Sequence, residues 1–130
     1  MRSPVLVVDD ERDLRVTYER LLRRHGYRVV HADSRYEGIA VVEAEPLSLV
    51  VVDLKLHDGS GLDVVRAARS ATVPVPALVL AHVPSLGNRD LAAHAGAAGF
   101  LAKPCSASDF LAGVREILGS SNGPSGVSSR

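Results

Sequence analysis

The feature that most constrains the fold is a regular alternation of short, β-branched apolar runs with longer segments of helical period. This alternation is typical of a parallel β-sheet with helices on both faces. Residues 49–52 are apolar without alternation, which indicates a central strand buried on both sides. The predicted strands are Val5–Val8, Tyr27–His31, Leu47–Val52, Val75–Leu80 and Gly99–Ala102.

Segments with helical spacing follow each predicted strand, and a third helix fits residues 62–69. Several residues are typical of helix ends. The sequence therefore predicts one α/β domain with a (βα)5 order, covering residues 1–119, and a flexible polar tail or linker at 120–130. The predicted start signals are Asp10, Ser34 with Glu37, Asn88, and Ser106 with Asp109, and the predicted end signals are Gly26, Pro46, Gly96 and Gly119.

Composition excludes several classes of protein. The 130 residues include 15 basic and 15 acidic side chains, so the net charge of zero gives no electrostatic reason to expect nucleic acid or an anionic membrane as a partner. A single cysteine, Cys105, rules out an intrachain disulfide. The N-terminus lacks an apolar signal sequence, and no run approaches the roughly 18 apolar residues of a membrane span. We expect a cytoplasmic protein.

Charged side chains follow three of the predicted strands at their carboxyl ends. Asp9 and Asp10 follow the first, Asp53 the third and Lys103 the fifth. Ligands of open α/β sheets bind at this edge, so we expect the four side chains to converge. Carboxylates without nearby Cys or His ligands favour Mg²⁺ as the bound cation. Taken singly, each Asp is more often a turn or helix-cap residue and the Lys a surface residue.

Three motifs resemble the receiver domain of two-component response regulators. They are V-L-V-V-D-D-E, V-V-V-D-L-K-L-H-D-G-S-G-L and G-A-A-G-F-L-A-K-P, beginning at Val5, Val50 and Gly96. Together they cover nearly the whole chain, from about Val5 to Leu118. The resemblance implies a flavodoxin-like sheet of five parallel strands in the order 2-1-3-4-5.

The resemblance also implies roles for particular residues. Asp53 would accept a phosphoryl group from the phosphohistidine of a histidine kinase or a phosphotransfer protein. Asp10 would hold Mg²⁺ directly, Asp9 largely through water, and Lys55 through its backbone carbonyl. Lys103 would pair with Asp53 and then with the phosphoryl oxygens, and its peptide bond to Pro104 would be cis.

Two positions depart from the family pattern where the signal is transmitted. Ala81 lies where a Ser or Thr hydroxyl usually contacts the phosphoryl group, so one hydrogen bond of about 1.5–3 kcal/mol is missing. His82 follows at a position where a small residue is usual; it either donates to the phosphoryl group, crowds the entrance to the site or has no role.

Three further residues differ from the family pattern or have two interpretations. Phe100 is either the family's switch aromatic or a plain core residue. His57 and Cys105 replace a Pro and a Phe.

Two hypotheses of function follow. In the first, the chain is a phosphoaccepting receiver that switches a protein-binding surface. In the second, it is a degenerate receiver that binds a partner independently of phosphorylation, because Ala81 lacks the hydroxyl. An enzyme is not expected, since aspartyl phosphatases carry a second Asp where this chain has Lys55. The expected output surface is the face of the fourth helix, fifth strand and fifth helix, for a downstream protein or a second copy.

Overall fold

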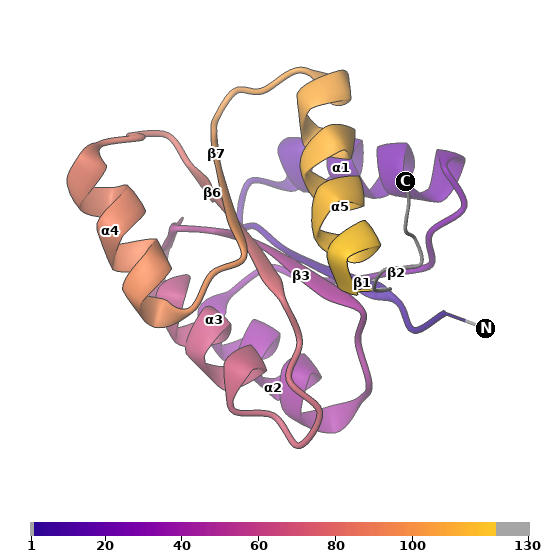
Figure 1. Ribbon diagram of the computed structural model, residues 1–130, viewed down its shortest axis with the longest axis horizontal. Coiled ribbons are helices and arrows are strands. Elements are labelled where there is room, and N and C mark those ends of the chain that lie inside the picture. The colour runs from indigo at the N-terminus through magenta and orange to yellow at the C-terminus, as the bar shows by residue number, and fades with distance from the viewer. Residues whose placement is uncertain (1, 122–130) are drawn as a thin grey trace.

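The computed structural model describes residues 2–121, which form a central sheet between two layers of helices (Figure 1). The strands are β1 (Val5–Val8), β2 (Val29–Ala32), β3 (Leu49–Asp53), β4 (Lys55–Leu56), β5 (Gly59–Ser60), β6 (Ala77–Ala81) and β7 (Gly99–Ala102). The helices are α1 (Arg12–Arg24), α2 (Arg35–Ala44), α3 (Leu62–Arg69), α4 (Leu86–Ala95) and α5 (Ala107–Ser121). Among the described residues, no helix is long and apolar enough to cross a membrane.

The sheet confirms the predicted flavodoxin-like α/β architecture. Its five strands are parallel and lie in the order β2-β1-β3-β6-β7, which is the predicted order 2-1-3-4-5. The register places Val8 beside Val52 and Ala81 beside Ala102. The residues that follow these strands therefore meet at one edge of the sheet.

Alternate residues of the central strands enter two separate cores, because successive side chains of a strand point to opposite faces. One core is covered by α2, α3 and α4, and the other by α1 and α5, as Figure 1 shows. In the second core the rings of Tyr18 and Phe110 stack with their centroids 4.7 Å apart. All five residues of β3 are buried, which confirms the central strand that its unbroken apolar run predicts.

Three predicted helix signals were wrong in detail. The N-cap of α1 is Glu11 and not Asp10, because the backbone turns helical one residue later. Ser85, not Asn88, caps α4 by accepting from the Asn88 amide at 3.0 Å, so the helix begins earlier. Helix α5 continues through Gly119 to Ser121. The greater part of the predicted tail, residues 122–130, lies outside the described residues.

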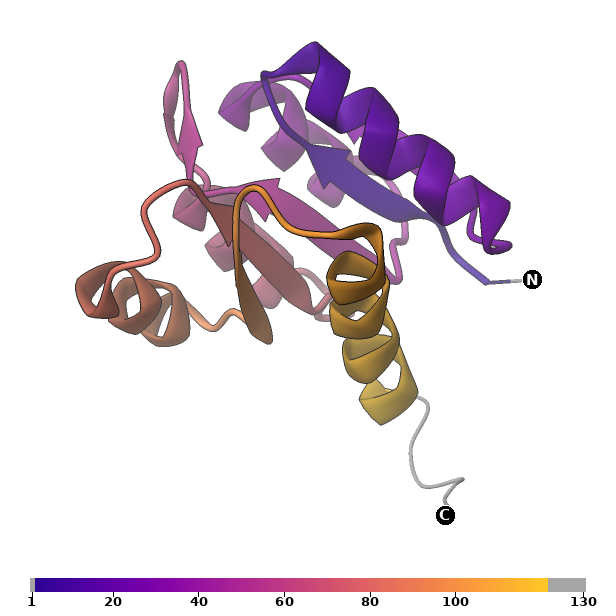
Figure 2. The same ribbon diagram turned by 90° about the horizontal axis from the view of Figure 1, so that it is seen from above.

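The sequence patterns did not predict the short antiparallel hairpin of β4 and β5, which connects β3 to α3. Figure 2 shows it as the magenta loop that projects beyond the sheet. Its Asp58 carboxylate accepts from the first two backbone amides of α2, at 2.7 Å and 3.0 Å. These bonds satisfy donors at the start of α2 and fix the hairpin beside the carboxyl edge of the sheet.

Candidate functional site

The carboxyl edge of the sheet holds a buried ion cluster built from three strands. Lys103 Nζ donates to Asp9 Oδ2 at 3.0 Å and to Asp53 Oδ2 at 3.1 Å. The side chains of Lys103, Asp9 and Asp53 are at most 3% exposed. The backbone of Lys103 is held by its amide, which donates to Ala81 O at 2.8 Å. The peptide bond that follows, to Pro104, is cis.

Burial and the neighbouring charges both shift the pKa values of Asp53 and Lys103. Burial raises the pKa of Asp53, and the nearby Asp9 carboxylate raises it further, while Lys103 opposes both. For Lys103, burial by itself lowers the pKa, but the hydrogen bonds and charges of Asp9 and Asp53 outweigh it, so the net shift is upward. The ammonium form of Lys103 is therefore favoured between the two carboxylates.

Asp10 lies at the outer side of the cluster. It accepts from the His57 backbone amide at 2.7 Å, and His57 Nδ1 lies 3.4 Å from the same oxygen. The Lys55 amide donates to Asp53 Oδ1 at 3.3 Å. The carboxylates of Asp9, Asp10 and Asp53 each place an oxygen within 4.8 Å of the others. Three carboxylates from two strand ends are a donor set that suits a hard dication such as Mg²⁺.

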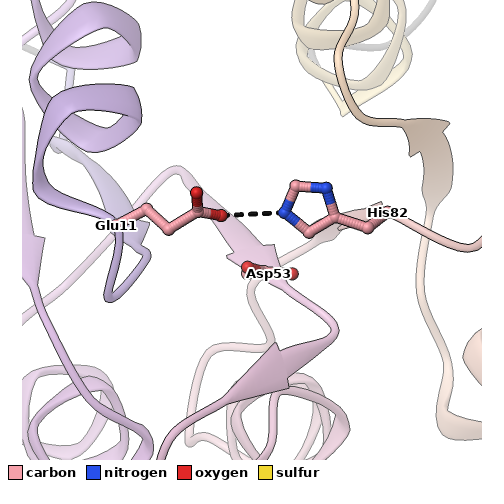
Figure 3. A group of neighbouring side chains, drawn as sticks. All are labelled: Glu11, Asp53 and His82. Carbon is pink, nitrogen blue, oxygen red and sulfur yellow. Dashed lines mark hydrogen bonds and ion pairs between the residues drawn. The ribbon is translucent and has the colours of Figure 1, made fainter.

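Glu11 and His82 meet across the site, as Figure 3 shows, with Asp53 between them and deeper. His82 Nε2 lies 2.8 Å from Glu11 Oε1, and the same oxygen accepts from Lys103 Nζ at 3.2 Å. Both side chains are about half exposed. The hydrogen bond with His82, followed by that with Lys103, lowers the pKa of Glu11. Through these contacts the Glu11 carboxylate belongs to the site.

Ala81, His82 and Phe100 occupy different environments. Ala81 is 1% exposed at the end of β6 and presents a methyl group at the position where the resemblance leads us to expect a hydroxyl. His82, which follows it, lies at the surface and is held by Glu11. Phe100 is half-buried on β7, where its ring lies 4.8 Å from the guanidinium carbon of Arg89 on α4. This cation–π contact joins α4 to β7.

A cleft of about 700 Å³ opens beside Asp53 between the β4–β5 hairpin and the start of α4. Gly61 follows the hairpin directly, and a Cβ atom there would overlap the backbone carbonyl of Asp53. The absence of a side chain thus lets α3 begin directly against the strand that carries Asp53. The cleft is lined by Asp53, His82, Ala81, Leu56, Leu62 and Leu91, among others.

The family model for the response regulator receiver domain matches residues 5–115. The chain belongs to this family. It is accordingly a receiver domain of a two-component system, as the three motifs indicate. Two further residues of these motifs, Glu11 and His57, also contact the site, although the sequence alone predicted no role for them there.

Individual relatives agree with the family match. The acid tolerance regulatory protein ActR of Rhizobium meliloti is 36% identical over 110 residues, which cover 85% of this chain and 57% of ActR. The receiver domain therefore spans about half the length of the curated relatives it matches.

Solved structures share the fold. A CheY-like receiver domain protein from Methanospirillum hungatei superimposes with a TM-score of 0.88 at 27% identity, covering 94% of this chain and 98% of the other. A response regulator from Burkholderia pseudomallei, solved with a phosphorylated aspartic acid, calcium and citrate, gives 0.81 at 28% identity, covering 96% and 74%.

Proposed function

We propose that this receiver domain accepts one phosphoryl group on Asp53, with Mg²⁺ bound beside it, and thereby changes a protein-binding surface. The observation that carries the proposal is the contact of Lys103 Nζ with Asp53 Oδ2 in a buried cluster that also contains Asp9. An ammonium at this point orients the acceptor carboxylate and can neutralise phosphoryl oxygens that arrive beside it.

In the transfer step, an oxygen of Asp53 attacks phosphorus and a P–O bond forms. The bond from phosphorus to the donor's histidine nitrogen breaks, and that nitrogen keeps the electron pair and then takes up a proton. Lys103 stays protonated throughout, in accordance with its raised pKa. The protein's contribution is thus positioning and charge neutralisation, as is usual for phosphoryl transfer.

Asp9, Asp10, Asp53 and the backbone carbonyl of Lys55 would hold Mg²⁺. The donor set fits this ion, since the three carboxylates supply hard oxygen ligands within 4.8 Å of one another. When bound, the dication supplies positive charge to the phosphoryl oxygens. The calcium and the phosphorylated aspartic acid of the Burkholderia pseudomallei regulator support both parts of this proposal.

The proposed donor is a histidine kinase or a phosphotransfer protein, and the proposed setting is the cytoplasm. The proposed output surface is the face formed by α4, β7 and α5, for a downstream protein or a second copy of the chain. Arg89 and Phe100 link α4 to β7 through their cation–π contact. Leu86 on α4 is 80% exposed and adds apolar area to the beginning of that helix.

A second candidate function is a degenerate receiver that binds its partner regardless of phosphorylation. The buried methyl group of Ala81 favours it, because the usual hydroxyl contact to the phosphoryl group is missing. The bond between Glu11 and His82 favours it too, since this bond lies across the approach to Asp53. No turnover on external substrates is proposed for either function.

The test is incubation of the chain with a small acyl phosphate and Mg²⁺, followed by intact-protein mass spectrometry. We expect one phosphoryl group on the wild type and none on Asp53→Asn. Asp13→Asn is the matched control, because it removes an exposed carboxylate on the first turn of α1 and is expected to leave the modification in place. An unmodified wild-type protein would overturn the first function. A partner that binds wild type and Asp53→Asn equally would favour the second.

A further inference from the structure

A second group of metal-binding side chains lies at the mouth of the site. Glu11, Asp53 and His82 each place one ligand atom within 4.8 Å of the others. They come from three different elements: the start of α1, the end of β3 and the loop after β6. This group shares Asp53 with the carboxylate group described above but contains neither Asp9 nor Asp10.

The chemistry of this second group differs from that of a magnesium site. An imidazole nitrogen with two carboxylate oxygens suits zinc and other borderline transition metals, whereas Mg²⁺ prefers oxygen ligands and water. Zinc binds such ligands at about 2.0–2.2 Å in a tetrahedral arrangement, which separates ligand atoms by about 3.4 Å. His82 Nε2 and Glu11 Oε1 are already 2.8 Å apart. Both side chains are about half exposed, so they can adjust around an ion.

The charge of the site leaves room for a second cation. Four carboxylates, those of Asp9, Asp10, Glu11 and Asp53, surround the single buried ammonium of Lys103. One Mg²⁺ leaves the cluster with net negative charge. Lys103 contacts Oδ2 of Asp53, whereas Oδ1 accepts from the Lys55 amide at the longer distance of 3.3 Å, so Oδ1 is the oxygen available to an ion. The adjoining cleft, lined by Asp53 and His82, gives access to this point and space for water ligands.

We propose that Glu11, Asp53 and His82 form a binding site for a borderline transition-metal dication, and that this ion and a phosphoryl group exclude each other at Asp53. On binding, the Nε2 proton of His82 is lost or moves to Nδ1, and the His82–Glu11 hydrogen bond is replaced by two bonds to the metal. The mutual exclusion of metal and phosphoryl group rests on the proposed function, because it requires Asp53 to be the phosphoryl acceptor. Binding of the metal does not depend on the proposed function.

Binding is tested by calorimetric titration of the full chain with ZnCl₂ in the absence of Mg²⁺, and again with Mg²⁺ present, because the two groups share Asp53. We expect one high-affinity zinc ion and a loss of affinity of at least about tenfold in His82→Asn and Glu11→Gln, since each variant removes a ligand. His94→Asn is the matched control, because that exposed histidine is hydrogen-bonded to the Asp90 carbonyl of its own helix, outside the proposed group. It is expected to bind zinc like the wild type.

Three results would overturn the site: no zinc binding, an equal loss in His94→Asn, or a loss in His57→Asn with none in His82→Asn. The last would place zinc on His57 and Asp10 instead.

The mutual exclusion of zinc and the phosphoryl group is tested by the rate of phosphorylation from a small acyl phosphate with and without zinc. We expect zinc to slow the wild type at least tenfold and to have a smaller relative effect on His82→Asn. If zinc binds through His82 but phosphorylation is not slower, the mutual exclusion is wrong. If the chain is never phosphorylated, the proposed function is wrong, but the calorimetric test of zinc binding still holds.

Discussion

At the scale of single residues, burial and neighbouring charges have opposing effects on Asp53, the proposed acceptor. Asp53 is 3% exposed and lies near the carboxylate of Asp9, so ionising it in the folded protein is less favourable than in the unfolded chain. Lys103 reduces this cost without removing it, as the net upward shift in the pKa of Asp53 shows. The folded protein thus keeps a carboxylate at a buried position where its ionisation costs free energy, as reactive sites commonly do.

A neutral side chain at position 53 should therefore stabilise the fold. Because the folded pKa of Asp53 is raised, the folded state binds its proton more tightly, and its ionisation destabilises the protein above that pKa. In the absence of divalent cations we expect Asp53→Asn to raise the free energy of unfolding at pH 7 by on the order of 1 kcal/mol. The gain should shrink as the pH falls from the raised pKa of the folded state toward the ordinary Asp value of about 4, below which the carboxyl is protonated in both states. Urea unfolding at several pH values measures it.

The control for this prediction is Asp58→Asn. The pKa of the exposed Asp58 carboxyl is lowered, chiefly by the hydrogen bond from the Tyr36 amide, so its ionised form is favoured in the folded state. We expect this variant to be less stable than the wild type at pH 7. A destabilised Asp53→Asn would mean that the attraction of Lys103 outweighs the burial of the carboxylate.

At the scale of elements, the site depends on how closely the segment after β3 returns to that strand. The Gly61 amide donates to Leu54 O at 2.8 Å, and the backbone of Gly61 touches the carbonyl of Asp53. The hairpin between them is tied to α2 through Asp58 and to Asp10 through the His57 amide. The carboxylates of β1 and β3 are thus fixed by connections between loops as well as by the sheet.

A side chain at position 61 should separate these segments. We expect Gly61→Ala to lower the free energy of unfolding by about 1–3 kcal/mol, because the added Cβ would overlap the Asp53 carbonyl and the backbone must move. Phosphorylation should also slow, since the acceptor moves with its backbone. Gly119→Ala is the control, because a Cβ there meets nothing within 4 Å, and in helix α5 we expect it to raise stability by up to about 1 kcal/mol. Equal effects on thermal unfolding in both variants would contradict the close contact.

At the scale of the whole molecule, the sheet connects two separate cores to one charged edge. The strands β1 and β3, which carry Asp9 and Asp53, contribute alternate residues to both cores. An ion held at their ends consequently stabilises the arrangement of both layers. It has no comparable site in the unfolded chain, where the carboxylates are far apart in sequence.

Magnesium should therefore raise the temperature of unfolding. A dication at 100 times its dissociation constant adds about 2.7 kcal/mol to the free energy of unfolding if it binds only the folded state. We expect a concentration-dependent shift in thermal denaturation for the wild type and a much smaller shift for Asp10→Asn. Asp13→Asn, on the first turn of α1, is the control and should behave like the wild type. An undiminished shift in Asp10→Asn would exclude Asp10 as a ligand.

The order of elements and the parallel sheet could be predicted from the sequence because they depend on periodicity, which is local. Caps were predicted less well. Asn88 and Ser85 both have the chemistry of an N-cap, and only the backbone path chooses Ser85. The hairpin of β4 and β5 could not be predicted, since strands of two residues carry no periodic signal.

The sequence by itself determined the fold, the strand ends that carry Asp9, Asp53 and Lys103, and the absence of a hydroxyl at Ala81. Side-chain type and spacing suffice for these. Only the tertiary structure decided that Glu11 and His82, 71 positions apart in the chain, form a bond across the acceptor. The reason is that both lie in connections beyond strand ends, whose side chains have no periodic direction. Their meeting depends on the twist of the sheet and the paths of the β1–α1 and β6–α4 loops.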